Sequence, residues 1–314
     1  ASADFMAKLL HGRADDLLSL MCLARPIDRV PLVLAPAMNR EMWQHPATQR
    51  NMTQLKADGA HVLDVGQGEQ ACGETGDGRM LEPEEILEDL VAFFRPKVLS
   101  GHHVLVTAGP TYEAMDPVRG ITNLSSGKMG FAIARAAREA GAVVTLVAGP
   151  VHLPTPRGVQ RVDVRSALDM QAAVAAHVDA ASVFVATAAV ADWRIAEVAG
   201  EKIKKEGSGQ LPQLNFVENP DILAGVAQSA RAKSGALYCV GFAAESHDLL
   251  KHATAKRERK GVPLLVGNIG PATFGLDDNA LLLVDAQGSQ ELPHANKLTL
   301  ARQLVNEIAR RLHA

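Results

Sequence analysis

The stretch at residues 101–149 constrains the fold more than any other part of the chain. Residues 103–106 and 143–147 are short apolar runs that predict two buried strands, and a helical pattern that ends at Gly141 lies between them. Strand, helix and strand make a βαβ unit, which predicts an α/β fold with a mainly parallel sheet. The loop after the first strand is much longer than an ordinary connection, and parallel α/β sheets bind ligands at such loops.

The helix of this unit begins after Ser125, Ser126 and Gly127. Backbone N–H groups, two hydroxyls and the positive end of the helix dipole would converge there, an arrangement that suits a phosphate. An ordinary N-cap by Ser125 or Ser126 accounts for the same residues. The segment contains neither GxGxxG nor GxxxxGK[ST], so it carries neither a standard dinucleotide fingerprint nor a P-loop.

Composition argues against several classes of protein. With 47% apolar and 21% charged residues, the 314-residue chain is typical of a soluble globular protein with two domains. A formal net charge of −3 argues against a general nucleic-acid-binding protein, and no apolar run approaches the roughly 20 residues that span a membrane. The three cysteines form no CxxC pair, so they indicate neither a zinc site nor a disulfide framework, and we expect a cytoplasmic protein.

We place a domain boundary at 96–101, after a predicted helix that ends near Pro96, and expect domains at 1–97 and 98–314. The glycine-dense stretch 66–80 predicts a mobile flap or an active-site loop. Asn219 is predicted to be the N-cap of a helix. The other predicted elements are the helices 7–23, 45–56, 167–178, 249–260 and 296–312, the strands 31–35, 61–65, 161–164, 182–188, 237–242 and 264–266, an antiparallel pair around 287–288, and a surface loop at 200–209.

Several polar residues stand where ligands bind, and each has a structural alternative. Asp192 follows a predicted strand, where it is either a ligand or a cap or turn residue. Lys202 belongs to a basic, glycine-flanked segment that is either a solvated charge run or a lid for an anion. Lys256 and Lys260 share one helix face, for which a solvent-exposed surface is the simplest interpretation. Cys72, between glycines, is either a reactive thiol or an unremarkable one.

Two stretches of the first domain resemble flavin-dependent phosphopantothenoylcysteine decarboxylases. PAMNREMW at 36–43 is similar to their PxMNxxMW motif, and ACGETGDGRM at 71–80 is similar to their substrate-covering flap. The resemblance implies that Asn39, otherwise a turn residue, binds the substrate, that Cys72 donates a proton, and that FMN is the cofactor. The family's first strand, flavin-binding loop and catalytic histidine precede the part that matches Ala1, so we expect an incomplete flavodoxin-like domain that does not decarboxylate by itself.

From residue 101 onward the chain resembles phosphopantothenate–cysteine ligases, and as a whole it resembles the bifunctional bacterial enzymes of coenzyme A biosynthesis. The matching stretches are VTAGPTYEAMDPVRGITNLSSGKMG, ATAAVADWR, EKIKK, NPDIL and VGFAAES. The resemblance implies that CTP, with Mg²⁺, activates the carboxylate of 4′-phosphopantothenate as an acyl-cytidylate, and that L-cysteine then displaces CMP. It also implies a Rossmann-like ligase domain and a homo-oligomer in which ligase domains form dimers, with no nucleic-acid or membrane partner.

The same resemblance assigns roles to single residues. It implies that Lys202 is the catalytic lysine, that Asn123 holds the acyl-cytidylate, and that Arg119 contacts the substrate. No protein ligand of Mg²⁺ is assigned. The implied CTP site consists of Ser125, Ser126, Gly127, Ala186, Thr187, Ala188, Asp192, Lys202, Pro220, Asp221, Ile222, Leu223, Phe242, Lys256 and Lys260.

Two other functions stay open at this point. One is an NAD(P)-dependent oxidoreductase built on the βαβ unit, against which the missing GxGxxG counts. The other is a non-catalytic role, in which the first domain is an assembly surface that regulates a partner.

Overall fold

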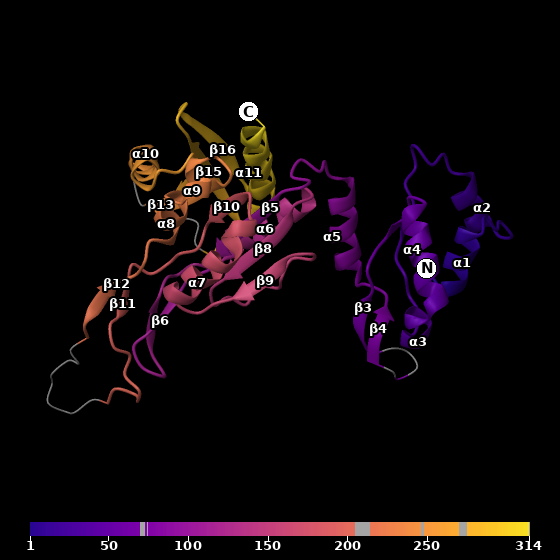
Figure 1. Ribbon diagram of the computed structural model, residues 1–314, viewed down its shortest axis with the longest axis horizontal. Helices are drawn as coiled ribbons and strands as arrows, with labels where there is room; N and C mark the ends of the chain where they lie inside the picture. The colour runs from indigo at the N-terminus through magenta and orange to yellow at the C-terminus, as the bar shows by residue number, and fades with distance from the viewer. Residues whose placement is uncertain (70–72, 74, 205–213, 246–247, 270–274, 314) are drawn as a thin grey trace. The chain divides into compact units, whose positions relative to one another are not determined.

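The computed structural model describes residues 1–69, 73, 75–204, 214–245, 248–269 and 275–313. The chain divides into two compact units, Ala1–Phe94 and Arg95–Ala314 (Figure 1). Within the described ranges, no helix has both the length and the apolar composition needed to cross a membrane.

The first unit combines helices with two small sheets. β1 and β2 pair in parallel, and Met6, Leu34, Leu55 and Val62 form the core around them. β3 and β4 form an antiparallel hairpin. The elements are α1 (Ala3–Leu10), α2 (Leu17–Ala24), β1 (Val33–Leu34), α3 (Arg40–Gln44), α4 (Pro46–Ala57), β2 (His61–Val62), β3 (Gly66–Glu69), β4 (Thr75–Arg79) and α5 (Pro83–Phe94).

One prediction for this unit is wrong, and the stretch 66–80 has regular structure that was not expected. The helix expected at 7–23 is two helices, because Gly12 takes a left-handed conformation (φ 62°) and Asp16 begins α2 with a capping box to Ser19. The stretch 66–80, predicted to be a mobile flap or an active-site loop, contains the β3–β4 hairpin, which is rich in glycine and therefore gives no apolar alternation in the sequence.

The second unit is built on an eight-stranded sheet with the order β16-β15-β14-β13-β10-β5-β8-β9. The strands from β14 to β9 are parallel, and β15 and β16 add an antiparallel edge. This confirms the predicted α/β class, the mainly parallel sheet and the antiparallel pair. The strands are β5 (His103–Ala108), β8 (Val143–Ala148), β9 (Gln160–Asp163), β10 (Val183–Ala186), β13 (Tyr238–Glu245), β14 (Leu264–Ile269), β15 (Asp278–Val284) and β16 (Ser289–Asn296).

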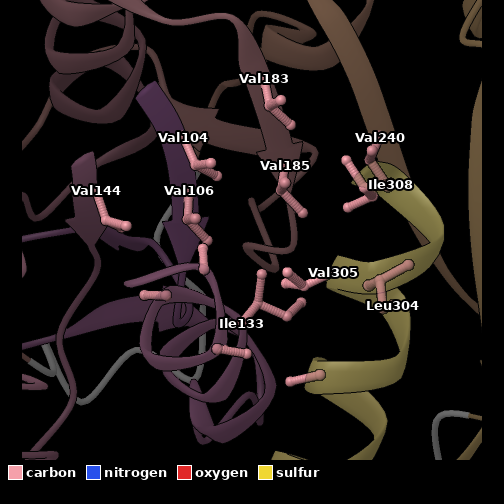
Figure 2. Close-up of a cluster of buried hydrophobic side chains, with 14 of the residues drawn as sticks. Val104, Val106, Ile133, Val144, Val183, Val185, Val240, Leu304, Val305 and Ile308 are labelled. Carbon is pink, nitrogen blue, oxygen red and sulfur yellow. The ribbon is translucent and has the colours of Figure 1, made fainter. Parts of the chain in front are cut away.

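Helices cover both faces of this sheet, because successive side chains of its central strands point to opposite faces and nearly all of them are buried. In β5, Val104 and Val106 pack toward α6 and α11, whereas Leu105 packs toward α7, α8 and α10. Figure 2 shows Leu304 and Ile308 of α11 facing the valines of the central strands. The helices are α6 (Lys128–Glu139), α7 (Ala167–His177), η1 (Val178–Ala180), α8 (Ile222–Ala227), α9 (Ala230–Lys233), α10 (Leu249–Lys260) and α11 (Lys297–Leu312).

Two short antiparallel pairs follow neighbouring strands of the sheet. β6 (Tyr112–Ala114) pairs with β7 (Gly120–Thr122) after β5, and β11 (Trp193–Ile195) pairs with β12 (Phe216–Glu218) after β10. None of these four strands was expected, because three residues are too few to show a period of two. β6 and β7 lie within the long polar connection that the sequence predicts after β5.

Candidate functional site

A cavity of about 660 Å³ lies at the carboxyl edge of the parallel strands in the second unit. The chain runs from β5 to β8 and β9 on one side, and then returns to place β10 on the other side of β5. This reversal is the topological switch point at which open α/β sheets bind ligands. The loops after β5 and β10 both line the cavity, together with the starts of α6 and α8 and one face of α10.

The start of α6 forms one wall of the cavity. Gly127 is the N-cap in a left-handed conformation (φ 75°), and no side chain among the described residues caps the helix. The alternative in which Ser125 or Ser126 is the N-cap is therefore wrong; the Ser125 hydroxyl instead accepts a bond from the Gly127 N–H at 3.3 Å. Both serines, Gly127 and Lys128 line the cavity, so the positive end of the helix is directed at its contents.

Hydrogen bonds between β5 and the end of β10 hold the cavity floor. The Thr187 N–H donates to the Thr107 carbonyl at 3.1 Å, and the Ala188 N–H reaches the Thr107 hydroxyl at 3.4 Å. Asp192 lies at the rim with an exposed side chain, and its carbonyl accepts from the Asn219 N–H at 2.8 Å. These bonds fix the backbone of 186–192, which the sequence predicted only as a strand followed by a turn.

Asp221 begins α8, so the prediction of an Asn219 N-cap is wrong. The Asp221 carboxylate accepts from the Ala224 N–H at 2.9 Å, whereas the Asn219 amide donates to the Ala191 carbonyl at 2.9 Å. Asn219 thus ties the start of α8 to the loop after β10. Pro220, Ile222, Leu223 and Phe242 complete this part of the cavity wall.

Lys256 and Lys260 both line the cavity rather than an open helix surface. The Lys260 ammonium pairs with the Asp221 carboxylate, and its side chain is only 16% exposed. Burial raises the pKa of Asp221, but the Lys260 hydrogen bond, the Ala224 N–H and the charges of both lysines lower it by more than burial raises it. The net pKa therefore lies below the ordinary value. The carboxylate is therefore ionised at neutral pH and keeps Lys260 directed into the site.

Sequence reasoning missed two further lysines that line the cavity. The Lys128 ammonium donates to Asp277 at 2.7 Å and to the Gly275 carbonyl at 2.8 Å. Lys297 is buried, bonds the Leu276 carbonyl, and has a pKa lowered by burial and by the charge of Lys128. The position of Lys128 directly after Gly127 could have indicated it, whereas only the tertiary fold brings Lys297 here from α11.

Asn123, Arg119 and Lys202 do not line this cavity. The Asn123 amide donates to the carbonyl of Ala189, a cavity residue, at 2.9 Å, so Asn123 stands next to the rim. The Arg119 guanidinium donates to the Ile203 carbonyl at 2.7 Å, which places Arg119 beside the exposed Lys202. Residues 205–213, which follow Lys202 closely, lie outside the described residues.

The two candidate residues of the first unit have different outcomes. The Asn39 side chain accepts from the Met42 N–H at 2.9 Å and begins α3, as a turn residue does, and its role in substrate binding stays a prediction. Cys72 lies outside the described residues. The Met38 N–H donates to the Gly78 carbonyl at 2.9 Å, so strand β4 of the predicted flap lies against the turn that holds Asn39.

Two family models match the chain. The model described as "DNA/pantothenate metabolism flavoprotein C-terminal domain" matches residues 99–312, and the model described as "Flavoprotein" matches residues 1–95. Flavoprotein sequence is therefore present from the first residue and throughout the first unit. The expectation about elements upstream of Ala1 concerns residues outside this chain and stays a prediction.

The chain is also similar to whole proteins. It is 46% identical to the coenzyme A biosynthesis bifunctional protein CoaBC of Vibrio cholerae over 98% of this chain and 76% of the relative. It is 47% identical to the protein of the same name from Escherichia coli, over 99% of this chain and 76% of the relative. The solved C-terminal domain of a CoaBC protein matches with a TM-score of 0.59 and 35% identity, over 69% of this chain and 98% of that domain.

Proposed function

The chain belongs to the family of the coenzyme A biosynthesis bifunctional protein CoaBC, and on this basis we propose that its second unit is a CTP-dependent phosphopantothenate–cysteine ligase. A carboxylate oxygen of 4′-phosphopantothenate attacks the α-phosphorus of CTP, and pyrophosphate leaves. The amine of L-cysteine then attacks the acyl carbon of the acyl-cytidylate. CMP leaves with the electron pair of the broken C–O bond, and loss of the amine proton completes the amide.

One observation carries this proposal: every residue assigned to CTP except Lys202 lines a single cavity. These residues come from the loop after β5, the end of β10, the start of α8, strand β13 and helix α10, which are distant in sequence. The cavity volume of about 660 Å³ falls within the range of small-molecule sites. The carboxylate attacks the α-phosphorus, so the acid has to lie beside the bound nucleotide.

The charges of the site suit a reaction between two anions. Lys128, Lys256, Lys260 and Lys297 line the cavity, and their fixed ammonium groups offset the charge that develops on the departing pyrophosphate. The N–H groups at the start of α6 add uncharged donors for phosphate oxygens. In this proposal Lys202 and Arg119 act on the acid and the α-phosphate, and Asn123, anchored to the cavity rim, holds the acyl-cytidylate.

Mg²⁺ is proposed to enter with the triphosphate, since it prefers phosphate oxygens and water as ligands. Among the described residues there is no group of three or more His, Cys, Asp or Glu side chains that could hold a metal ion. We therefore assign no protein ligand to it.

We propose that the complete bifunctional protein also decarboxylates the ligation product with FMN as cofactor, and that the first unit is part of that decarboxylase domain. When bound, FMN would supply the transient two-electron oxidation of the substrate's cysteine-derived thiol. We assign no residue in the described part of this unit to the flavin; the Asn39 side chain accepts from the Met42 N–H and begins α3. No step of our proposal therefore passes through flavin.

The proposal is tested by pyrophosphate release from CTP in the presence of 4′-phosphopantothenate and L-cysteine. Lys202→Gln is expected to lower the rate about 100-fold or more, because it removes a fixed charge from the transition state. Lys204→Gln, an exposed change two residues away, is the matched control. Unchanged turnover of Lys202→Gln would show that the role of the lysine is misassigned. Binding of NADPH but not of CTP would favour the oxidoreductase alternative.

We also propose that the enzyme is cytoplasmic and forms a homodimer through its second unit. Light scattering on the full chain measures the oligomeric state directly. A catalytically inactive chain that nevertheless assembles with a partner would support the regulatory alternative.

A further inference from the structure

The carboxylate of Asp116 is fully buried in the turn between β6 and β7, where it accepts hydrogen bonds from its own turn and from a distant segment. Its Oδ1 atom accepts from the Val118 and Arg119 N–H groups, each at 2.8 Å. Its Oδ2 atom accepts from the Arg119 guanidinium at 2.6 and 3.0 Å and from the Ile203 N–H at 3.1 Å. The Arg119 side chain, followed by these backbone donors, holds the pKa of Asp116 far below its ordinary value, so the group is ionised.

The segment before Lys204 is attached to this turn by two further bonds. The Arg119 guanidinium donates to the Ile203 carbonyl at 2.7 Å, and the Ala199 N–H donates to the Met115 carbonyl at 3.1 Å. Both backbone groups of Ile203 are thus held by the Asp116–Arg119 pair. Lys202 stands between these attachment points, and its backbone cannot move away from the turn without breaking them.

We propose that Asp116 is a positioning residue for the ligation, which holds the Arg119 guanidinium and the backbone beside Lys202 in one arrangement. This inference rests on the proposed function, which gives Arg119 and Lys202 their roles. The Arg119 side chain is 48% exposed, so an anion can contact it while Asp116 occupies the buried side. A carboxylate bound at Arg119 therefore lies next to the backbone that carries Lys202, and the two groups meet the acid together.

A second carboxylate in the chain shows what such a turn does without the extra segment. Asp285 accepts from the N–H groups of Gln287 and Gly288, two and three residues ahead, and from the Arg311 guanidinium at 2.9 Å. The two backbone donors have the same spacing as at Asp116, and the side-chain partner is again an arginine, although Arg311 comes from α11 and not from the turn itself. What Asp116 adds is the bond to a segment 87 residues away. Asp285→Asn is therefore a matched control for Asp116→Asn.

The test compares Asp116→Asn, Ile203→Pro and Asp285→Asn in the full chain. Ile203→Pro deletes the N–H that Asp116 accepts and leaves the carboxylate and Arg119 in place. We expect Asp116→Asn and Ile203→Pro to lower kcat about 100-fold, since misplacing a reacting group by about 1 Å has this effect. The Kd of CTP should stay within about twofold, because the cavity residues are unchanged and distant changes act independently. Asp285→Asn should leave both quantities near those of the wild type.

Amide hydrogen exchange of the peptide that covers residues 199–204 supplies a readout that needs no turnover. Exchange should be faster in Asp116→Asn than in the wild type and in Asp285→Asn, because the Ile203 N–H loses its acceptor. If Asp116→Asn does not fold, Ile203→Pro still decides the matter. Wild-type values of kcat in both variants would overturn the positioning role, whatever the exchange shows. A wild-type chain that does not turn over CTP would instead refute the proposed function, and unchanged exchange would refute the attachment itself.

Discussion

Gly130 provides a direct test of how closely α6 must approach the sheet for the site to form. A Cβ atom added to Gly130 would lie 2.5 Å from the Ala108 Cβ and 2.5 Å from the Thr187 hydroxyl oxygen. Carbon atoms pack at about 3.5–4.0 Å, so Gly130→Ala forces the start of α6 to retreat by roughly 1 Å. Ala108 ends β5 and Thr187 follows β10, so these neighbours belong to the rigid edge of the sheet.

The magnitude follows from two opposing terms. Overpacking a tight site costs about 1–3 kcal/mol, and alanine gains about 1 kcal/mol over glycine in a helix, so the net change in the free energy of unfolding is a loss of up to about 2 kcal/mol. The displacement also moves the Gly127 and Lys128 N–H groups away from the cavity. Losing one hydrogen bond to a charged group costs about 1.5–3 kcal/mol, so we expect CTP to bind at least about tenfold more weakly.

Gly225→Ala is the matched control, because it makes the same change inside a helix of the same unit. A Cβ atom at Gly225 meets no other atom within 4 Å, so this variant should be stabilised by about 0.5–1 kcal/mol. Urea unfolding followed by circular dichroism measures stability, and isothermal titration calorimetry measures CTP affinity. If Gly130→Ala were as stable as Gly225→Ala and bound CTP like the wild type, the close approach of α6 would have no role in the site.

Two further predictions concern buried charge. Glu139 is 1% exposed and hydrogen-bonded to Arg302 and Arg135. Glu139→Gln should therefore lower the free energy of unfolding by about 3 kcal/mol or more. Burial raises the pKa of Glu139, but the two arginines lower it more, so that the net pKa lies below the ordinary 4.5. The stabilisation is therefore present above that pH and is lost in acid. The free energies of unfolding of wild type and variant, measured in urea, should converge as the pH falls. Lys260→Met should weaken CTP binding about tenfold, whereas Lys251→Met, an exposed change on the same helix, should not; equal titrations would refute the assignment.

The regular elements of the second unit were predictable because their patterns are long. The predicted helix 249–260 has the bounds of α10, and the helix 296–312 differs from α11 by one residue. The hairpins β6–β7 and β11–β12 were not predictable in the same way. Trp193 pairs with Glu218, and such a pairing depends on tertiary contacts that no local period records.

The same distinction between local patterns and tertiary contacts applies to the residues of the site. The segments that carry whole motifs, such as Ser125–Gly127, could be placed at a ligand by resemblance and by their position after a strand. Lys297 and Asp116 could not, because Lys297 belongs to the apolar pattern of a C-terminal helix and Asp116 to a polar loop. Both become part of the site only when the chain folds and brings residues from distant segments together. Sequence reasoning therefore named residues that belong to recognisable motifs and did not name Lys297 or Asp116, whose contacts come from distant segments.

Exchange of labelled pyrophosphate into CTP tests the central claim most directly, since it reports formation of the acyl-cytidylate in the cavity before the amide is made. We predict exchange that requires 4′-phosphopantothenate and proceeds without L-cysteine, and that falls sharply in Lys202→Gln. Exchange that is absent with both substrates present, or that appears only when cysteine is added, would contradict it.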